Sequence, residues 1–278
     1  MSDHQLLIGF IGGGNMARAI ITGLLGAGHQ PGRLWVADPS DAQRRMLRAL
    51  DKHVRVCSDN LAVAESAEVL VLAVKPQLMQ AVVAGLHDAV RPQTQLVVSI
   101  AAGITLASLS AWLKGQTAVV RVMPNQPALV GAGMSVLTAS ADTGLGQRHQ
   151  AQYVAEAMGS ARWVENETLM DAVTAISGSG PAYFYLLMEI MEDCAREMGL
   201  PAELARTLPR ETAFGAGCVA RESPTDVAEL RAGVTSPGGT TEAALAVLES
   251  ADFRDIFRRA LQAARDRSVD LGKPPRDG

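Results

Sequence analysis

A short apolar run that ends in a glycine turn constrains the fold of this chain more than any other feature. The run covers residues 6–11, and its length and composition are typical of a buried strand. The sequence G-x-G-x-x-A follows at residues 12–17, and an apolar helical pattern comes next. In this context Gly12 permits a tight turn, Gly14 lets backbone N–H groups approach a pyrophosphate, and Ala17 lets the helix pack closely on the strand. The turn therefore predicts a dinucleotide-binding unit.

Short apolar runs alternate with helical stretches up to about residue 164. The runs cover residues 6–11, 34–37, 69–74, 96–100, 118–123 and 134–137. Helical stretches of crossover length lie between them, for example at residues 42–50, 78–90 and 107–113. This alternation predicts an α/β domain with a doubly wound parallel sheet of the Rossmann type and helices on both faces. Ligands of such sheets bind at the carboxyl ends of the strands.

Strand patterns stop beyond residue 165, and the rest of the chain is expected to be all helical. Residues 166–176 predict a helix that is broken at residues 177–180, and Pro181 stands at the first position of the next helix. That helix, over residues 182–199, is apolar around much of its circumference, so it is expected to be buried in a domain core or against another chain. Further helical runs cover residues 202–221, 225–231 and 240–267. We therefore predict a dinucleotide-binding domain over residues 1–164 and an all-α dimerisation and substrate domain over residues 165–278.

A second glycine-rich segment precedes the helical run that begins at Glu242. It reads VTSPGGTT at residues 234–241, and combines two glycines and a proline with four hydroxyl side chains. A helix start carries unpaired backbone N–H groups and a partial positive charge, so it suits a carboxylate or a phosphate. The alternative is an ordinary capped turn between two helices, because Ser and Thr are common N-cap residues.

Composition argues against several other classes of function. The net charge is −4 and the 25 Lys and Arg residues form no run, so nucleic acid is not an expected partner. No apolar stretch is long enough to cross a membrane, and the first residues do not resemble a signal peptide, so a cytoplasmic location is expected. Three separated cysteines, at positions 57, 194 and 218, predict neither a metal site nor a disulfide framework.

Asp38 follows the second predicted strand and bears on the choice of cofactor. An acidic residue at this point accepts hydrogen bonds from the adenosine ribose and favours NAD, because it would repel a 2′-phosphate. Arg44 and Arg45 follow closely, and Arg is well suited to clamp such a phosphate. Both arginines could equally lie on a solvated helix face. NADH and NADPH therefore both stay open.

Six ordered blocks resemble pyrroline-5-carboxylate reductases along essentially the whole chain. They are IGFIGGGNM (8–16), AVKP (73–76), SIAAG (99–103), MPN (123–125), SGSGPAY (177–183) and VTSPGGTT (234–241), the last preceded by Leu230 and Arg231. The resemblance implies an oxidoreductase that uses NADPH or NADH to reduce a small molecule, the cyclic imine 1-pyrroline-5-carboxylate, to L-proline in the last step of proline biosynthesis. It also implies a homodimer of intertwined helical domains with each active site near the interface. Assembly of dimers into rings is left open.

The resemblance also implies roles for individual residues. The catalytic hydroxyls are those of Thr241, which hydrogen-bonds the ring nitrogen, and Ser236. The remaining substrate-binding residues are Val234, Thr235, Gly238, Gly239 and Thr240. The cofactor-binding residues are Gly12, Gly13, Gly14, Asn15, Met16, Asp38, Asn60, Ala73, Val74, Lys75, Pro76, Ile100, Ala101, Ala102 and Asn125. Lys75 could be a general acid, but its place in a cofactor-side loop favours a positioning role. A protonated cyclic imine accepts hydride readily, so no metal is expected.

Some positions depart from the commoner family pattern, and two rival functions stay in view. Gln126 stands where many members carry threonine, and Ala232 and Gly233 replace a more polar pair. A 3-hydroxyacid dehydrogenase would need a lysine in the helical domain, yet residues 115–272 contain none. A non-catalytic dinucleotide sensor is expected to have lost the hydroxyl-rich loop, which this chain retains.

Overall fold

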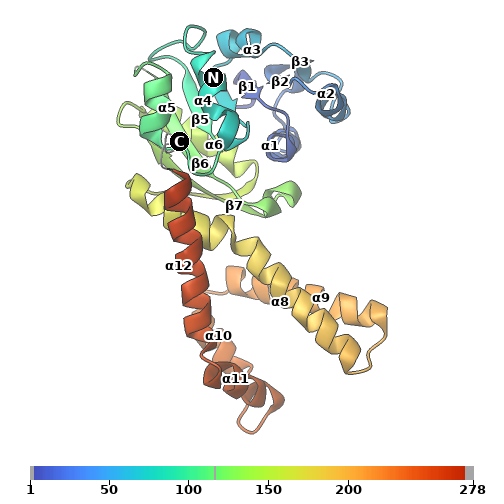
Figure 1. Cartoon of the computed structure of the whole chain (residues 1–278). Helices are drawn as coiled ribbons and strands as arrows, with labels where there is room; N and C mark the ends of the chain where they lie inside the picture. The colour runs from blue at the N-terminus through green and yellow to red at the C-terminus, as the bar shows by residue number, and fades with distance from the viewer. Residues whose placement is uncertain (1–2, 116, 273–278) are drawn as a thin grey trace. The chain divides into compact units, whose positions relative to one another are not determined.

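The computed structural model describes residues 3–115 and 117–272 and divides the chain into two compact units (Figure 1). The first unit comprises the described residues up to Gly178 together with those from Ala264 onward. The second unit is Ser179–Ala263. The predicted domain boundary between residues 164 and 165 lies just after the last strand and stays a prediction. The compact units divide later in the chain because residues 165–178 pack with the sheet.

The first unit is built on one eight-stranded sheet with the order β3-β2-β1-β4-β5-β6-β7-β8. Its strands are β1 (Ile8–Ile11), β2 (Leu34–Ala37), β3 (Arg55–Cys57), β4 (Val69–Leu72), β5 (Leu96–Ser99), β6 (Ala118–Met123), β7 (Gly133–Ala139) and β8 (Gly159–Trp163). Neighbouring strands are parallel except β6 and β7. The predicted parallel sheet is therefore mostly parallel, and this pair is its antiparallel exception. Only residues 124–132 join the two strands, and a parallel pair needs a longer crossover.

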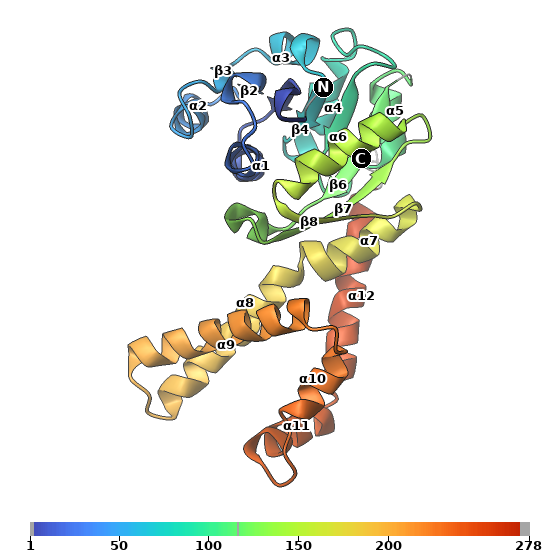
Figure 2. The ribbon, with the colours of Figure 1, turned by 180° about the vertical axis from the view of Figure 1, so that it is seen from behind.

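Apolar cores cover both faces of this sheet, which confirms the predicted doubly wound architecture. One core packs α1 (Asn15–Gly26), α6 (Leu145–Glu156) and Leu47 of α2 (Asp41–Arg48) against the strands. The other packs α3 (Asn60–Ser66), α4 (Pro76–Ala84) and α5 (Leu106–Trp112) against the opposite face. Figures 1 and 2 show α3 and α1 on opposite sides of the strands β1 and β2. The strands read as nearly continuous apolar runs because both of their faces are buried.

The segment after β8 belongs to the first unit and is held there by polar contacts. It comprises the short helices η4 (Glu167–Leu169) and α7 (Met170–Val173) and the π-helix η5 (Thr174–Gly178), where the sequence predicted one helix. Arg121 of β6 pairs with Glu167 at 3.0 Å, and the hydroxyl of Ser268 donates to Asp171 at 2.7 Å. These two contacts tie both the beginning of the segment and the end of the last helix to the first unit.

The second unit is helical, as predicted. It contains α8 (Gly180–Glu197), α9 (Ala202–Glu222), α10 (Val227–Gly233) and α11 (Thr240–Ser250), and α12 (Phe253–Leu271) runs from it into the first unit. The run predicted over residues 240–267 is two helices, because Asp252 adopts φ 52°, in the left-handed region. Apolar side chains of α8 are exposed in the single chain, among them Phe184, Leu187 and Met191 at 62%, 40% and 49%. Of the two predicted locations for these side chains, the structure therefore excludes the core of the domain. Burial against another chain is the alternative that is left.

Candidate active site

The glycine turn after β1 has the geometry that the sequence predicts. Gly12 has φ +97°, and its N–H donates to the carbonyl of Ala37 at the end of β2 at 2.8 Å. A Cβ at position 12 would come within 2.7 Å of the carbonyl oxygen of Ala73, which follows β4. Both observations require glycine here. The turn thus lies where the ends of β1, β2 and β4 meet.

The start of α1 is open to a ligand. Gly14 is its N-cap residue, and no side chain caps the helix there. An added Cβ at Gly14 would meet nothing within 4 Å, so the space beside the backbone is unfilled by protein. The first backbone N–H groups of a helix have no acceptor within it, and together with the helix dipole they favour an anion. The turn from Gly12 to Met16 therefore fits the pyrophosphate of a dinucleotide.

Asp38 lies against this turn and is only 8% exposed. Its Oδ2 accepts the N–H of Gly13 at 2.8 Å, and its Oδ1 accepts the N–H of Ser40 at 2.8 Å. The sequence placed Asp38 beside the cofactor but gave no sign that its carboxylate also holds the glycine turn. That contact joins residues 25 positions apart, and only the pairing of β1 with β2 brings them together.

The other predicted cofactor residues of the first unit follow neighbouring strands. Since β1 to β6 are parallel, their carboxyl ends share one edge of the sheet. That edge receives Asn60 after β3, Ala73, Val74, Lys75 and Pro76 after β4, Ile100, Ala101 and Ala102 after β5, and Asn125 after β6. Lys75 is exposed and stands at the N-cap position of α4 without a capping bond. The structure thus brings this set together as a continuous rim.

Asn125 is tied to the protein at both ends of its amide. Its Nδ2 donates to the carbonyl of Ser177 at 3.2 Å, and its Oδ1 accepts the N–H of Met134 at 2.9 Å. Ser177 lies in the π-helix η5, and such bulges occur frequently at functional sites. The contact between Asn125 and Ser177 spans 52 residues, so the sequence marks both motifs but gives no sign that they touch.

The hydroxyl-rich loop lies in the second unit and forms the N-terminus of α11. Gly238 has φ +72°, and Gly239 is the N-cap residue. The N–H of Gly239 donates to the carbonyl of Ser236 at 3.0 Å, and a Cβ at Gly239 would come within 2.9 Å of that oxygen. The hydroxyl of Thr235 donates to the carbonyl of Arg231 at 2.7 Å. Both glycines are therefore needed for the shape of the loop.

One donor assigned to the substrate is already engaged. The N–H of Gly238 donates to Oε2 of Glu242 at 2.7 Å, so the side chain of Glu242 reaches back over the helix start. The N–H groups of Thr240 and Thr241 lie in the first turn of α11, where helical backbone offers no acceptor. These two groups are the better candidates for a carboxylate. The sequence predicts that Glu242 lies in the helix but gives no sign of its contact with Gly238.

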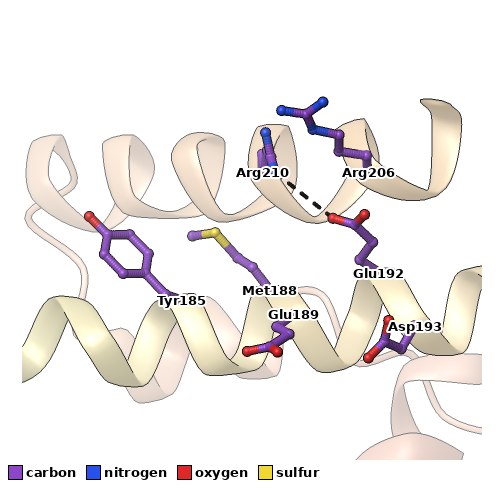
Figure 3. A pocket seen from close by; sticks show the side chains of 7 residues that line it. All are labelled: Tyr185, Met188, Glu189, Glu192, Asp193, Arg206 and Arg210. Atoms are coloured by element: carbon purple, nitrogen blue, oxygen red, sulfur yellow. Dashed lines mark ion pairs between the residues drawn. The ribbon is translucent and has the colours of Figure 1, made fainter. Parts of the chain in front are cut away.

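The second unit also has hollows between its helices. One, of about 570 Å³, is lined by Tyr185, Met188, Glu189, Glu192, Asp193, Arg206 and Arg210 (Figure 3). Arg210 of α9 faces Glu192 of α8 across it at 3.9 Å. The mixture of charges belongs to the contact between the two helices, and the hollow includes none of the predicted site residues.

Two further findings concern metals and membranes. Over residues 3–115 and 117–272, no cluster of three His, Cys, Asp or Glu side chains could hold a metal ion. Within the same ranges, no helix has the length and apolar character that a membrane span requires.

Comparison with known proteins supplies an independent line of evidence. A family model described as pyrroline-5-carboxylate reductase dimerisation matches residues 167–271, and one described as NADP oxidoreductase, coenzyme F420-dependent, matches residues 7–103. The pyrroline-5-carboxylate reductase of Pseudomonas aeruginosa is 46% identical over 266 residues, which cover 96% of this chain and 97% of that protein.

Solved structures agree with the sequence matches. A pyrroline-5-carboxylate reductase from Coxiella burnetii superposes with a TM-score of 0.91 at 40% identity and covers 97% of this chain and all of its own. The pyrroline carboxylate reductase of Plasmodium falciparum, solved with NADP bound, gives a TM-score of 0.85 at 28% identity, with coverage of 97% and 99%.

Proposed function

Because the chain belongs to the pyrroline-5-carboxylate reductase family, we propose that its hydroxyl-rich loop binds the substrate and that Thr241 is the catalytic residue. The chain is an oxidoreductase that reduces 1-pyrroline-5-carboxylate to L-proline with NAD(P)H, in the last step of proline biosynthesis. The observation that carries the site proposal is the start of α11, where the backbone N–H groups of Thr240 and Thr241 lie in the first helical turn together with the Thr241 hydroxyl.

The glycine turn is proposed to hold the cofactor. The backbone of Gly12, Gly13 and Gly14 and the first turn of α1, with Asn15 and Met16, would receive the pyrophosphate. The loops at Asn60, Ala73–Pro76, Ile100–Ala102 and Asn125 would border the remaining cofactor. The bound nicotinamide supplies the hydride. Lys75 is assigned a positioning role, since it is an exposed residue at the start of α4.

The substrate carboxylate is proposed to lie at the N-terminus of α11. Thr240 and Thr241 offer the backbone N–H groups of the first turn, and the helix dipole favours the negative charge. Val234, Thr235, Gly238 and Gly239 shape the loop around it. The ring nitrogen then faces the Thr241 hydroxyl, which can donate to or accept from it, and Ser236 supplies the second hydroxyl. Because these hydroxyls orient the imine, the reaction needs no stronger acid from the protein.

Self-association follows from the dimerisation domain that residues 167–271 match. We propose that the partner covers the apolar surface of α8 that includes Phe184, Leu187 and Met191. A cytoplasmic location is also proposed, and the free thiols of Cys57, Cys194 and Cys218 fit a reducing compartment.

The carboxylate site is tested with two ligands that differ only in that group. L-proline should raise the melting temperature of the oxidised-cofactor complex and inhibit competitively with 1-pyrroline-5-carboxylate. Pyrrolidine, which has the same ring without the carboxylate, should bind at least about tenfold more weakly, because it forgoes the charge-assisted bonds at the helix start. Equal binding of the two ligands, measured by calorimetry, would remove the start of α11 from substrate recognition.

A further inference from the structure

We propose that Asp38 sets the cofactor preference of this enzyme and that NADH is bound in preference to NADPH. The inference rests on the proposed function of the glycine turn as the cofactor site. It concerns a choice that the sequence leaves open, because an acidic residue and two arginines stand side by side there. The structure separates their roles.

The carboxylate of Asp38 is fixed where the adenosine ribose is expected. In dinucleotide-binding sheets, the acidic residue at the end of the second strand hydrogen-bonds the ribose hydroxyls. Asp38 follows β2 directly, and the N–H groups of Gly13 and Ser40 each hold one of its oxygens at 2.8 Å. A carboxylate oxygen has two lone pairs, so each oxygen can accept a further bond from a ribose hydroxyl.

The same carboxylate disfavours a 2′-phosphate. Asp38 is 8% exposed, so little water screens its charge. Both of its oxygens are held by backbone groups, one in the glycine turn and one in the loop to α2. The side chain therefore cannot swing away without freeing two backbone donors. A phosphate beside it would meet a like charge in a medium of low dielectric constant.

The arginines that could compensate are already engaged elsewhere. Arg44 donates through Nη1 to the carbonyls of Asp38 and Pro39, at 2.7 and 2.8 Å, and its Nη2 pairs with Asp41. Arg45 pairs with the other oxygen of Asp41 at 3.2 Å. To bind a phosphate, Arg44 would have to give up its bonds to two carbonyls and a carboxylate. The guanidinium N–H groups that could bind a phosphate side by side are used instead to hold the loop before α2.

Binding of two adenosine fragments tests the proposal without any catalysis. Calorimetry on the full chain should give a Kd for 5′-AMP that is about tenfold or more below that for adenosine 2′,5′-bisphosphate, since the fragments differ only in the 2′-phosphate. In Asp38→Asn, which has nearly the same shape without the charge, the ratio should shift by about tenfold toward the bisphosphate. Asp51→Asn makes the same change just beyond the other end of α2 and should leave the ratio alone.

Three results would overturn the proposal. The first is a wild-type chain that binds the bisphosphate as tightly as 5′-AMP or more tightly. Because this measurement needs only the wild-type chain, it tests the proposal even if Asp38→Asn fails to fold. The second is a folded Asp38→Asn chain with the wild-type ratio. Failure of the proposed function would look different, because 1-pyrroline-5-carboxylate would then be reduced with neither cofactor while the fragment preference could persist. The third overturning result is turnover that favours NADPH, which would contradict the NADH preference and leave the proposed reaction intact.

Discussion

Thr241→Ala is expected to lower kcat/KM for 1-pyrroline-5-carboxylate by about tenfold to a thousandfold, by analogy with the loss of one oriented hydrogen-bond donor at a reacting centre. The hydroxyl is proposed to orient the ring nitrogen, whose protonated form makes the imine carbon receptive to hydride. Its removal leaves the backbone N–H groups of α11 in place, so carboxylate binding should persist. Cofactor affinity should barely change, because the glycine turn lies in the other unit.

Steady-state kinetics with both substrates varied will measure this effect. Thr241→Ser keeps a hydroxyl and should recover most of the activity. Thr225→Ala makes the same change at an exposed residue of the second unit that has no assigned role, so its kcat/KM should stay within about threefold of the wild type. A Thr241→Ala enzyme with wild-type turnover would exclude this residue from the mechanism.

Phe184→Asp/Leu187→Asp is expected to raise the dimer dissociation constant by about a hundredfold to ten thousandfold. Each side chain contributes about 1.5–3 kcal/mol when it is removed from water, and about 1.4 kcal/mol corresponds to a factor of ten. Both residues lie on α8 and are exposed in the single chain, so their burial must come from a partner. Buried aspartates would add a desolvation penalty to the lost apolar contact.

Sedimentation equilibrium over a range of concentrations gives the dissociation constant directly. The matched control is Leu50→Asp/Leu145→Asp, which places two charges on exposed leucines of the first unit. That variant should remain as dimeric as the wild type. A folded α8 variant that still sediments as a dimer at low concentration would show that another surface forms the interface.

Local patterns were sufficient to predict the sheet where strands are buried on both faces. Residues 118–123, predicted as a strand, are β6 with the same bounds. The edge strands β3 and β8 were missed because they carry exposed arginines, Arg55 and Arg162, which weaken the apolar signal, and β3 is in addition only three residues long. The direction of β7 depends on the length of its connection to β6, which periodicity does not report.

The site was predictable as separate motifs but not as a set of contacts. The positive φ of Gly12 follows from the glycine motif itself. The bonds from Gly13 to Asp38 and from Asn125 to Ser177 depend on how strands are ordered, which a single sequence does not state. The same holds for the α8 surface. The apolar residues of α8 predicted that this helix is buried. The sequence did not say whether the core of the same chain or a partner buries it, and the exposure of these side chains in the single chain excludes the core.

The most direct test of the central claim is the oxidation of NADH and of NADPH, each followed by absorbance, when 1-pyrroline-5-carboxylate is added to the purified chain. We expect rapid oxidation with stoichiometric formation of L-proline, and a higher kcat/KM with NADH. Absence of substrate-dependent oxidation with both cofactors, in a preparation shown to be folded and dimeric, would contradict the assignment of this chain as a pyrroline-5-carboxylate reductase.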